Sequence, residues 1–367
     1  MSFVPPPYPY ERLDGLRARA SQHEGGAIDC SIGTPVDAPP PAVVEELARA
    51  IGARGYPASA GSPDYRAACA AWMQRRFDVA LSHDSVAACV GTKEFVGTLA
   101  GYLHLRSPER DTVLYPQISY PTYAMGATLS RLRAVPVTMV NGRLDLDSIN
   151  PTDVARALVL WSNSPSNPTG ALDDLETVAH WGRRHGVLVA SDECYAEFTW
   201  NGRPRTILEH GSEGVIAVHS ISKRSNLAGL RAGFYAGDSD TVEFLRSVRQ
   251  HAGFMVPGPV QAAVAVAYGD DDHVEVQRSI YRERLELIGS ALNEFGVDAP
   301  FPDGSFYLWC SKEGMDGWAL ATLLAEVSGL IVSPGDLYGP AGAAYARVAV
   351  VQPTERLSLA ASRLRSH

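Results

Sequence analysis

Four apolar segments of the chain each end in residues that can do chemistry. Residues 87–90 lead into Gly91-Thr92-Lys93, residues 157–161 into a turn with Asn167, residues 187–190 into Asp192 and Tyr195, and residues 215–218 into Ser220 and Lys223. A lysine amine can form an imine with a carbonyl compound, and a carboxylate can keep a pyridine nitrogen protonated. The sequence therefore predicts a site for a carbonyl cofactor that contains a pyridine ring.

Each of the polar side chains has one expected role in such a site. Lys223 would form the imine, and Asp192 would pair with the ring nitrogen so that the ring acts as an electron sink. Tyr195 and Asn167 would donate hydrogen bonds to the phenolate oxygen, which would favour the phenolate and tune the pKa of the imine.

A phosphate group on the cofactor would need a separate set of donors. The backbone N–H groups of Gly91, Thr92 and Lys93 open a predicted helix, and helix N-termini bind phosphate. Ser220 and Arg231 would add a hydroxyl and a guanidinium. These five residues are the predicted phosphate site.

The elements that must position these residues are strands of a parallel sheet. Short apolar runs alternate with helical patterns at residues 87–90, 112–115, 157–161, 187–190, 215–218 and 232–236. Such runs are typical of strands that are buried on both faces in an α/β protein. Since ligands bind beyond the carboxyl ends of parallel strands, we expect the polar residues to meet along one edge.

The helical pattern lengthens after about residue 241, which indicates a smaller α+β domain in the C-terminal part. We predict an N-terminal arm and part of the small domain over residues 1–40, a large cofactor-binding domain over residues 41–250 and a small domain over residues 251–367. Ser62 is expected to cap one helix, and another is expected to begin at Asp173-Asp174 and to stop at Gly186. The proline-rich residues 3–10 suggest an extended arm on the body or on a partner subunit.

Composition excludes several classes of protein. The net charge of −9 argues against a nucleic-acid surface and an anionic membrane surface. The five cysteines form no Cys-x-x-Cys pair and the ten histidines show no ligand spacing, so we expect free thiols and no metal. No signal peptide or membrane-spanning run is apparent, and we expect a cytoplasmic protein.

The polar motifs together resemble those of the fold-type-I aminotransferases, the aspartate aminotransferase superfamily. The matching elements are the Asn-Pro-Thr-Gly turn at Asn167, the Asp-Glu-Cys-Tyr element from Asp192, the Ser-Ile-Ser-Lys segment ending at Lys223 and the Gly-Leu-Arg-Ala-Gly segment around Arg231. The resemblance implies a large, mainly parallel sheet domain with a smaller α+β domain. It also implies pyridoxal 5′-phosphate as cofactor, bound to Lys223 as a Schiff base, and ping-pong transamination between an amino acid and a 2-oxo acid.

The same resemblance assigns roles to four residues whose roles do not follow from side-chain chemistry alone. Tyr120 matches the aromatic ring that stacks on the cofactor, and Tyr56 the tyrosine that reaches the phosphate of the neighbouring subunit. Arg347 matches the arginine that binds the substrate α-carboxylate, and Gly33 a backbone contact to that group. The role of Tyr56 implies a homodimer.

A narrower resemblance concerns the substrate. Residues 222–231 and 251–261 look like those of N-succinyldiaminopimelate aminotransferases of bacterial lysine synthesis, which use glutamate and 2-oxoglutarate as the second pair. Arg224, next to Lys223, either binds a substrate carboxylate or pairs within the structure, and the sequence leaves both open. Residues 253–255 are candidates to line the long apolar part of the substrate.

Other functions remain as alternatives. The amino donor could instead be aspartate, kynurenine or an aromatic amino acid. A C–S lyase of the same fold is disfavoured because such lyases carry histidine where this chain has Ser166. A non-catalytic regulator is disfavoured by the intact Lys223, Asp192, Tyr195 and Arg347.

Overall fold

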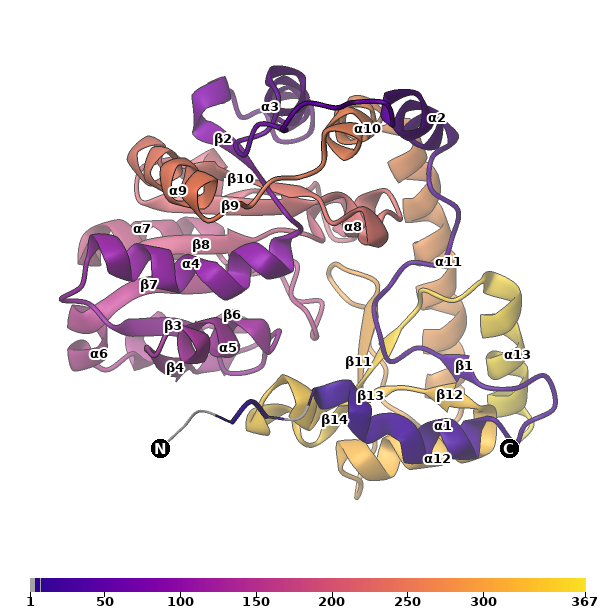
Figure 1. The fold of residues 1–367 in the computed structure, drawn as a ribbon. Helices are drawn as coiled ribbons and strands as arrows, with labels where there is room; N and C mark the ends of the chain where they lie inside the picture. The colour runs from indigo at the N-terminus through magenta and orange to yellow at the C-terminus, as the bar shows by residue number, and fades with distance from the viewer. Residues whose placement is uncertain (1–3, 7) are drawn as a thin grey trace.

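The computed structural model describes residues 4–6 and 8–367 and shows a large and a small domain (Figure 1). Of the predicted N-terminal arm, Phe3 and Pro7 lie outside the described residues. The arm leads into a short 3₁₀ helix, Pro9–Leu13, and then into α1 (Asp14–Ala20) of the small domain.

The large domain is built on a seven-stranded sheet with the order β2-β10-β9-β8-β7-β3-β4. Its strands are β2 (Val86–Cys89), β3 (Thr112–Pro116), β4 (Arg133–Val137), β7 (Ala157–Asn163), β8 (Leu188–Asp192), β9 (Val215–Ser220) and β10 (Gly233–Gly237). All pairs are parallel except those of β10, which runs antiparallel to both neighbours. The six predicted strands are therefore confirmed. The edge strand β4 was not predicted. Its apolar residues contain Pro136, and proline is found in sheets mainly on edge strands such as this one.

Alternate residues of these strands enter two different hydrophobic cores. On β8, for example, Val189 packs into one core and Ala190 into the other. The first core is covered by α2 (Pro41–Ala50), α3 (Pro63–Phe77), α7 (Leu175–His185) and α10 (Gly258–Gly269). The second is covered by α4 (Thr92–Arg106), α5 (Thr122–Leu129) and α9 (Ser239–His251). Burial on both faces explains why the strands are apolar without alternation.

Two helices begin at the predicted residues, and one of them also ends at its predicted residue. The Ser62 hydroxyl accepts a hydrogen bond from the backbone N–H of Tyr65 at 3.1 Å at the start of α3. Asp174 caps α7 in the same way, and Gly186 ends that helix with φ of 59°. Only glycine adopts this left-handed conformation without a steric penalty.

The small domain combines both ends of the chain. Its strands are β1 (Ile28–Asp29), β11 (Tyr307–Ser311), β12 (Leu330–Ile331), β13 (Ser333–Pro334) and β14 (Tyr345–Ala349). Its helices are α1, α11 (Asp272–Glu294), α12 (Gly317–Ser328) and α13 (Thr354–Arg365). The remaining elements are a hairpin of β5 (Met139–Val140) and β6 (Arg143–Leu144), and the short helices α6 (Pro151–Arg156) and α8 (Ile221–Arg224).

The hydrophobic core changes from the large to the small domain between α10 and α11. Val260 and Ala263 of α10 pack into the large-domain core, whereas Tyr281 and Leu285 of α11 belong to the small-domain core. The structure therefore favours a division near residue 270 over the predicted one at residue 250. The prediction took the change in helix length as the boundary, but the apolar face of α10 packs on α2 and α3.

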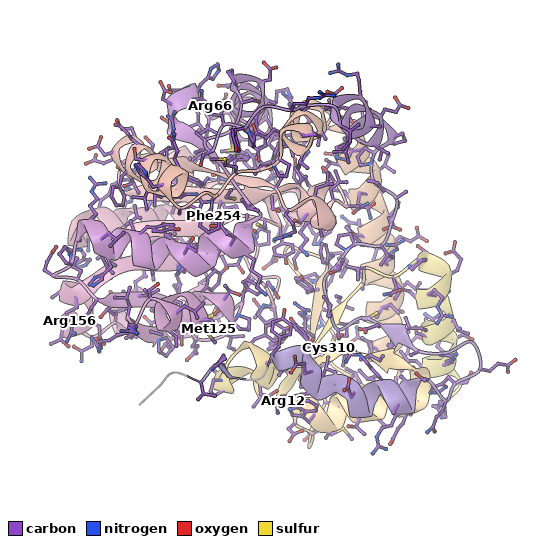
Figure 2. The ribbon with its side chains drawn as sticks, viewed as in Figure 1. Arg12, Arg66, Met125, Arg156, Phe254 and Cys310 are labelled. Atoms are coloured by element: carbon purple, nitrogen blue, oxygen red, sulfur yellow. The ribbon has the colours of Figure 1, made fainter. Side chains whose placement is uncertain are left out.

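Two negative findings hold for the part of the chain that the structure describes. It contains no helix with the length and hydropathy to cross a bilayer and no cluster of side chains that could hold a metal. All five cysteines are free thiols. The side chains themselves fill both domains closely (Figure 2).

Candidate active site

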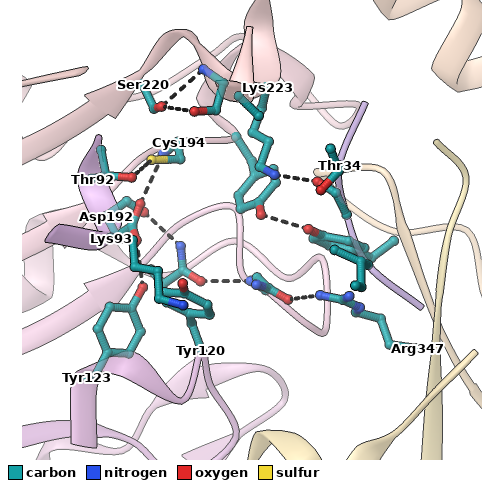
Figure 3. A pocket seen from close by; sticks show the side chains of 18 of the residues that line it. Thr34, Thr92, Lys93, Tyr120, Tyr123, Asp192, Cys194, Ser220, Lys223 and Arg347 are labelled. Carbon is teal, nitrogen blue, oxygen red and sulfur yellow. Dashed lines mark hydrogen bonds between the residues drawn. The ribbon is translucent and has the colours of Figure 1, made fainter. Parts of the chain in front are cut away.

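A cavity of about 240 Å³ lies where the carboxyl ends of β7, β8 and β9 face the small domain (Figure 3). Eleven of the predicted site residues line it: Gly33, Thr92, Lys93, Tyr120, Asn167, Asp192, Tyr195, Ser220, Lys223, Arg231 and Arg347. The parallel register explains the convergence, since Asp192 pairs with Asn163 of β7 and with Val218 of β9. The polar residues thus meet along one edge of the sheet, as expected.

Lys223 projects into the cavity from α8, directly after β9. The Ser220 hydroxyl caps this short helix by accepting from the N–H of Ser222 at 3.1 Å. The Lys223 ammonium donates to the carbonyl of Gly33 on the opposite wall. Burial, aided by the positive charges of Arg347 and Arg231, lowers the pKa of Lys223 to about 8. Much more of this amine is neutral near pH 7 than of an ordinary lysine, and only the neutral amine attacks a carbonyl.

Asp192 is a buried carboxylate at the end of β8. It accepts hydrogen bonds from the Tyr123 hydroxyl at 2.9 Å and from the Cys194 N–H at 3.2 Å. Burial raises the pKa of Asp192. No lysine or arginine of the described residues pairs with it. A protonated ring nitrogen in the cavity would supply the missing positive charge, so Asp192 fits the predicted cofactor.

Arg347 lies on β14 on the small-domain side of the cavity and is only 2% exposed. Its guanidinium donates to the Asn167 amide oxygen at 2.7 Å and to the Ser31 carbonyl at 2.5 Å, and it packs against the Tyr307 ring. Its Nε has no hydrogen-bond partner, and within residues 4–6 and 8–367 no carboxylate forms an ion pair with it. A buried, unpaired guanidinium is suited to bind a substrate carboxylate in bidentate geometry.

Two hydroxyls and an amide surround the space between Lys223 and Arg347. The Tyr195 and Tyr307 hydroxyls lie 2.7 Å apart, and burial raises the pKa of Tyr195 well above its usual value. The Asn167 N–H donates to the Asn163 side chain at 2.7 Å, which fixes the turn. Because Arg347 occupies the Asn167 amide oxygen, the amide NH₂ of Asn167 stays available to donate to a ligand oxygen.

The opposite end of the cavity suits a phosphate. Gly91 precedes α4 with φ of 74°, and a Cβ added there would collide with the Arg231 guanidinium. The close approach places Arg231 beside the first turn of α4, where Thr92 and Lys93 present backbone N–H groups. Ser220 lines the same end. Donors from a helix N-terminus and an arginine together form an anion site.

Several cavity residues were not predicted from the sequence. They are Tyr8, Tyr10, Ile32, Thr34, Tyr123, Asn163, Cys194, Ser222, Ala228 and Tyr307. Tyr123 could have been found, because it stands in the same Tyr-Pro-Thr-Tyr segment as Tyr120. Tyr8, Tyr10 and Tyr307 carry no such signal, since they reach the cavity only through the packing of the small domain.

The last two predicted residues lie away from the cavity in this chain. Tyr56 is 99% exposed. Arg224 faces away from Lys223 and is buried against Glu197, with Nε 3.5 Å from its carboxylate, and against the carbonyl of Ala267 at 2.6 Å. Of the two readings of Arg224, the structure therefore supports the pairing within the protein. The candidate substrate-lining residues 253–255 also do not line the cavity of the described chain.

Comparisons with known proteins agree with this arrangement. Residues 26–364 match the model of the family "Aminotransferase class I and II". The chain is 40% identical to the 4-dedimethylamino-4-oxo-anhydrotetracycline transaminase OxyQ of Streptomyces rimosus, over 98% of this chain and 99% of the relative. It is 35% identical to an LL-diaminopimelate aminotransferase of Desulforudis audaxviator, over 98% and 95%. An aminotransferase structure from Neisseria meningitidis superposes with a TM-score of 0.91 at 28% identity, covering 98% and 97% of the two chains. The chain therefore belongs to the class I and II aminotransferases, which use pyridoxal 5′-phosphate as their cofactor.

Proposed function

We propose that this aminotransferase uses Lys223 as its cofactor lysine and N-succinyl-LL-diaminopimelate with 2-oxoglutarate as its substrates. The observation that carries the general reaction is the pair of unmatched buried charges, Arg347 and Asp192, on either side of Lys223. Arg347 would hold the α-carboxylate of an amino acid, and Asp192 would hold the protonated ring nitrogen.

The residues divide the chemistry among them. When bound, the cofactor supplies an electron sink that stabilises negative charge at the substrate Cα. Lys223 would remove the proton from Cα as a general base and return one as a general acid, for which a pKa near the working pH is suited. Tyr195 and Asn167 would donate to the phenolate oxygen. Gly91, Thr92, Lys93, Ser220 and Arg231 would hold the phosphate.

The charge of the cavity supports a substrate with more than one anionic group. Four cations line it, namely Lys93, Lys223, Arg231 and Arg347, against one carboxylate, Asp192, although the whole chain carries a net charge of −9. Arg231 is assigned to the phosphate and Arg347 to the α-carboxylate. The Lys93 ammonium, 3.3 Å from the Tyr8 hydroxyl, is available for a second substrate anion.

The sequence resemblance in residues 222–231 and 251–261 supports the succinylated substrate over other dianions. The experiment is a comparison of kcat/KM for succinyl-diaminopimelate, free diaminopimelate, aspartate, kynurenine and aromatic amino acids. We expect the succinylated compound to be best by at least about tenfold, or about 1.4 kcal/mol of transition-state discrimination. A smaller advantage would leave the aminotransferase in place and remove this substrate.

LL-diaminopimelate itself is the second candidate. It is favoured by the 35% identity to the Desulforudis audaxviator protein of that name over nearly the whole chain. The two candidates differ at the distal amine, which is charged in LL-diaminopimelate and acylated in the succinyl compound. The same comparison of kcat/KM therefore separates them.

We also propose that the enzyme is a homodimer. Tyr56 is fully exposed in the single chain and lies outside the cavity, as expected for a residue that completes the phosphate site of a partner. Ile51 is 72% exposed in the same loop, which leaves an apolar surface for an interface. Light scattering at assay concentration should give twice the mass of one chain, and a fully active monomer would contradict the proposal.

A further inference from the structure

The three residues that follow Lys223 all bond to the connection between the two domains. Arg224 and Ser225 are buried and Asn226 is half-buried. Their partners lie at the end of α10 and in the first two turns of α11, where the hydrophobic core changes from the large to the small domain (Figure 1). Lys223 is thus directly followed by three residues whose side chains bond to the interdomain connection.

The Arg224 side chain caps the C-terminal end of α10. Its guanidinium donates to the carbonyl of Ala267 at 2.6 Å and to that of Asp270 at 3.3 Å, and it packs on the Tyr268 ring at 4.9 Å. The last carbonyls of a helix lack partners within the helix, and a cation there also complements the helix dipole. The position of α10 is therefore tied to the residue beside Lys223.

Ser225 and Asn226 bond to α11 itself. The Ser225 hydroxyl lies 2.9 Å from His273 Nε2, and the Asn226 amide donates to the Gln277 side chain at 2.8 Å. Gln277 in turn donates to Asp37 at 2.9 Å. Asn226 has φ of 56°, a left-handed conformation that asparagine tolerates better than most residues.

We infer that residues 224–226 are positioning residues, which keep Lys223 at a fixed distance from the reacting atoms by anchoring it to the interdomain connection. This inference rests on the proposed role of Lys223. Reacting atoms must come within about 3–3.5 Å, and a misplacement of about 1 Å can lower a rate by about a hundredfold. Arg347 reaches the same cavity from the small domain, so the relative placement of the two domains sets the distance between Lys223 and the bound carboxylate.

The chain contains a matched control on the same connection. Arg75 of α3 donates to the carbonyl of Tyr268 at 2.6 Å and to the Asp271 carboxylate at 3.0 Å. It anchors the connection to α3 and makes no hydrogen bond to residues 224–226, and the one group it shares with them is the Asp271 carboxylate, which lies 3.6 Å from Arg224. A change at Arg75 therefore weakens the connection without releasing the segment next to Lys223.

The test compares four holoenzyme variants: Ser225→Ala, Asn226→Gly, Gln277→Ala and Arg75→Gln. Asn226→Gly removes the amide but keeps the left-handed backbone accessible, so it separates the hydrogen bond from backbone strain. We expect Asn226→Gly and Gln277→Ala to lower kcat by about tenfold while the KM for the amino donor changes by less than about twofold. Their double variant should be no slower than the slower single variant, because both remove one shared bond. Ser225→Ala, the mildest change, should lower kcat in the same direction.

A spectroscopic readout separates positioning from loss of stability. With the cofactor bound, the group that titrates would be the imine formed by Lys223. Its pKa would depend on its distance from the positive charges of Arg347 and Arg231, which line the same cavity, so a displacement of Lys223 should move the pH midpoint of the visible absorbance. We expect a shift of about half a pH unit in the Asn226 and Gln277 variants. Arg75→Gln should lower the melting temperature but keep kcat and this midpoint.

Two results would overturn the inference while the wild type is active and carries its cofactor on Lys223. One is kcat and a midpoint close to the wild-type values in Ser225→Ala, Asn226→Gly and Gln277→Ala. The other is an equal loss of kcat in Arg75→Gln. If the wild type carries no cofactor on Lys223, the proposed function fails first and the inference fails with it.

Discussion

Two buried arginines, Arg347 and Arg224, have different surroundings: Arg347 lines the cavity, whereas Arg224 is packed inside the large domain. Each is 2% exposed, and each has an Nε without a hydrogen-bond partner. Arg224 nevertheless lies 3.5 Å from the Glu197 carboxylate and 3.6 Å from that of Asp271. Arg347 faces the cavity and bonds only to neutral oxygens, those of Asn167 and Ser31.

The difference lies in how the buried charge is neutralised. Arg224 is matched by carboxylates of the chain, so its contacts stabilise the free protein. Arg347 is left unmatched, so its desolvation is compensated only when an anion binds. If Arg347 binds the substrate as proposed, a buried cation without a counter-charge is a better sign of a binding site than a position next to Lys223.

Replacement of Arg224 should lower the free energy of unfolding far more than replacement of Arg347. Arg224→Met leaves Glu197 with less compensation and frees the Ala267 carbonyl, so it should lower the free energy of unfolding by about 3–5 kcal/mol. Arg347→Met removes an unmatched cation, while the Ser31 carbonyl keeps its bond from Ser333. It should cost less than about 1 kcal/mol. Urea unfolding of the cofactor-free proteins measures both, and equal losses would remove the distinction.

Replacement of Arg347 should affect catalysis strongly, although it affects stability little. Arg347→Lys keeps the charge but loses the two parallel donors for a carboxylate. We expect kcat/KM for amino acids to fall by roughly a hundredfold or more, with the cofactor still bound. Steady-state kinetics with a saturating oxo acid measures the change. Wild-type kinetics in this variant would show that another residue holds the α-carboxylate.

The unmatched charge of Arg347 should also be visible in the reactivity of Lys223. The folded pKa of about 8 lies below the ordinary lysine value of 10.5, so the neutral amine becomes the major form above pH 8. Capture of pyridoxal 5′-phosphate by the cofactor-free enzyme should speed up about tenfold per pH unit below pH 8 and level off above it. Arg347→Met should move this midpoint upward, since the Arg347 charge lowers the pKa. A rate that still rises steeply at pH 10 would contradict the lowered pKa.

The smallest expected effect comes from removing one tyrosine hydroxyl in each of the two regions. The Tyr195 hydroxyl lies 2.7 Å from that of Tyr307 in the cavity, whereas the Tyr268 hydroxyl, near Arg224, has no partner. A hydrogen bond contributes about 0.5–1.5 kcal/mol, so Tyr195→Phe should lower kcat/KM by about three- to tenfold. Tyr268→Phe should leave it unchanged, because the ring remains. Equal kinetics in the two variants would remove the role of the Tyr195 hydroxyl.

The sequence predicted the cavity residues that lie at strand ends far better than those contributed by the small domain. Thr92, Asp192 and Lys223 follow buried strands, and parallel pairing brings such residues together whatever the rest of the chain does. Tyr10 and Tyr307 reach the cavity through long-range packing, for which a single sequence carries no local signal. Arg347 was identified only by its resemblance to a family motif.

The direction in which a side chain points after a strand also could not be predicted from the sequence. Arg224 adjoins Lys223, but only Lys223 lines the cavity, and the carboxylates that pair with Arg224 come from distant segments. The predicted domain boundary near residue 250 rested on helix length alone. The helical pattern of α10 does not reveal that its apolar face packs on α2 and α3.

The central claim is that Lys223 is the cofactor lysine, and peptide mapping tests it directly. The purified enzyme should absorb visible light, and borohydride reduction should attach the cofactor irreversibly to one residue. Mass spectrometry of the digested protein should find the reduced cofactor on the peptide that contains Lys223. Attachment to Lys93, to any other lysine or to none would contradict the account.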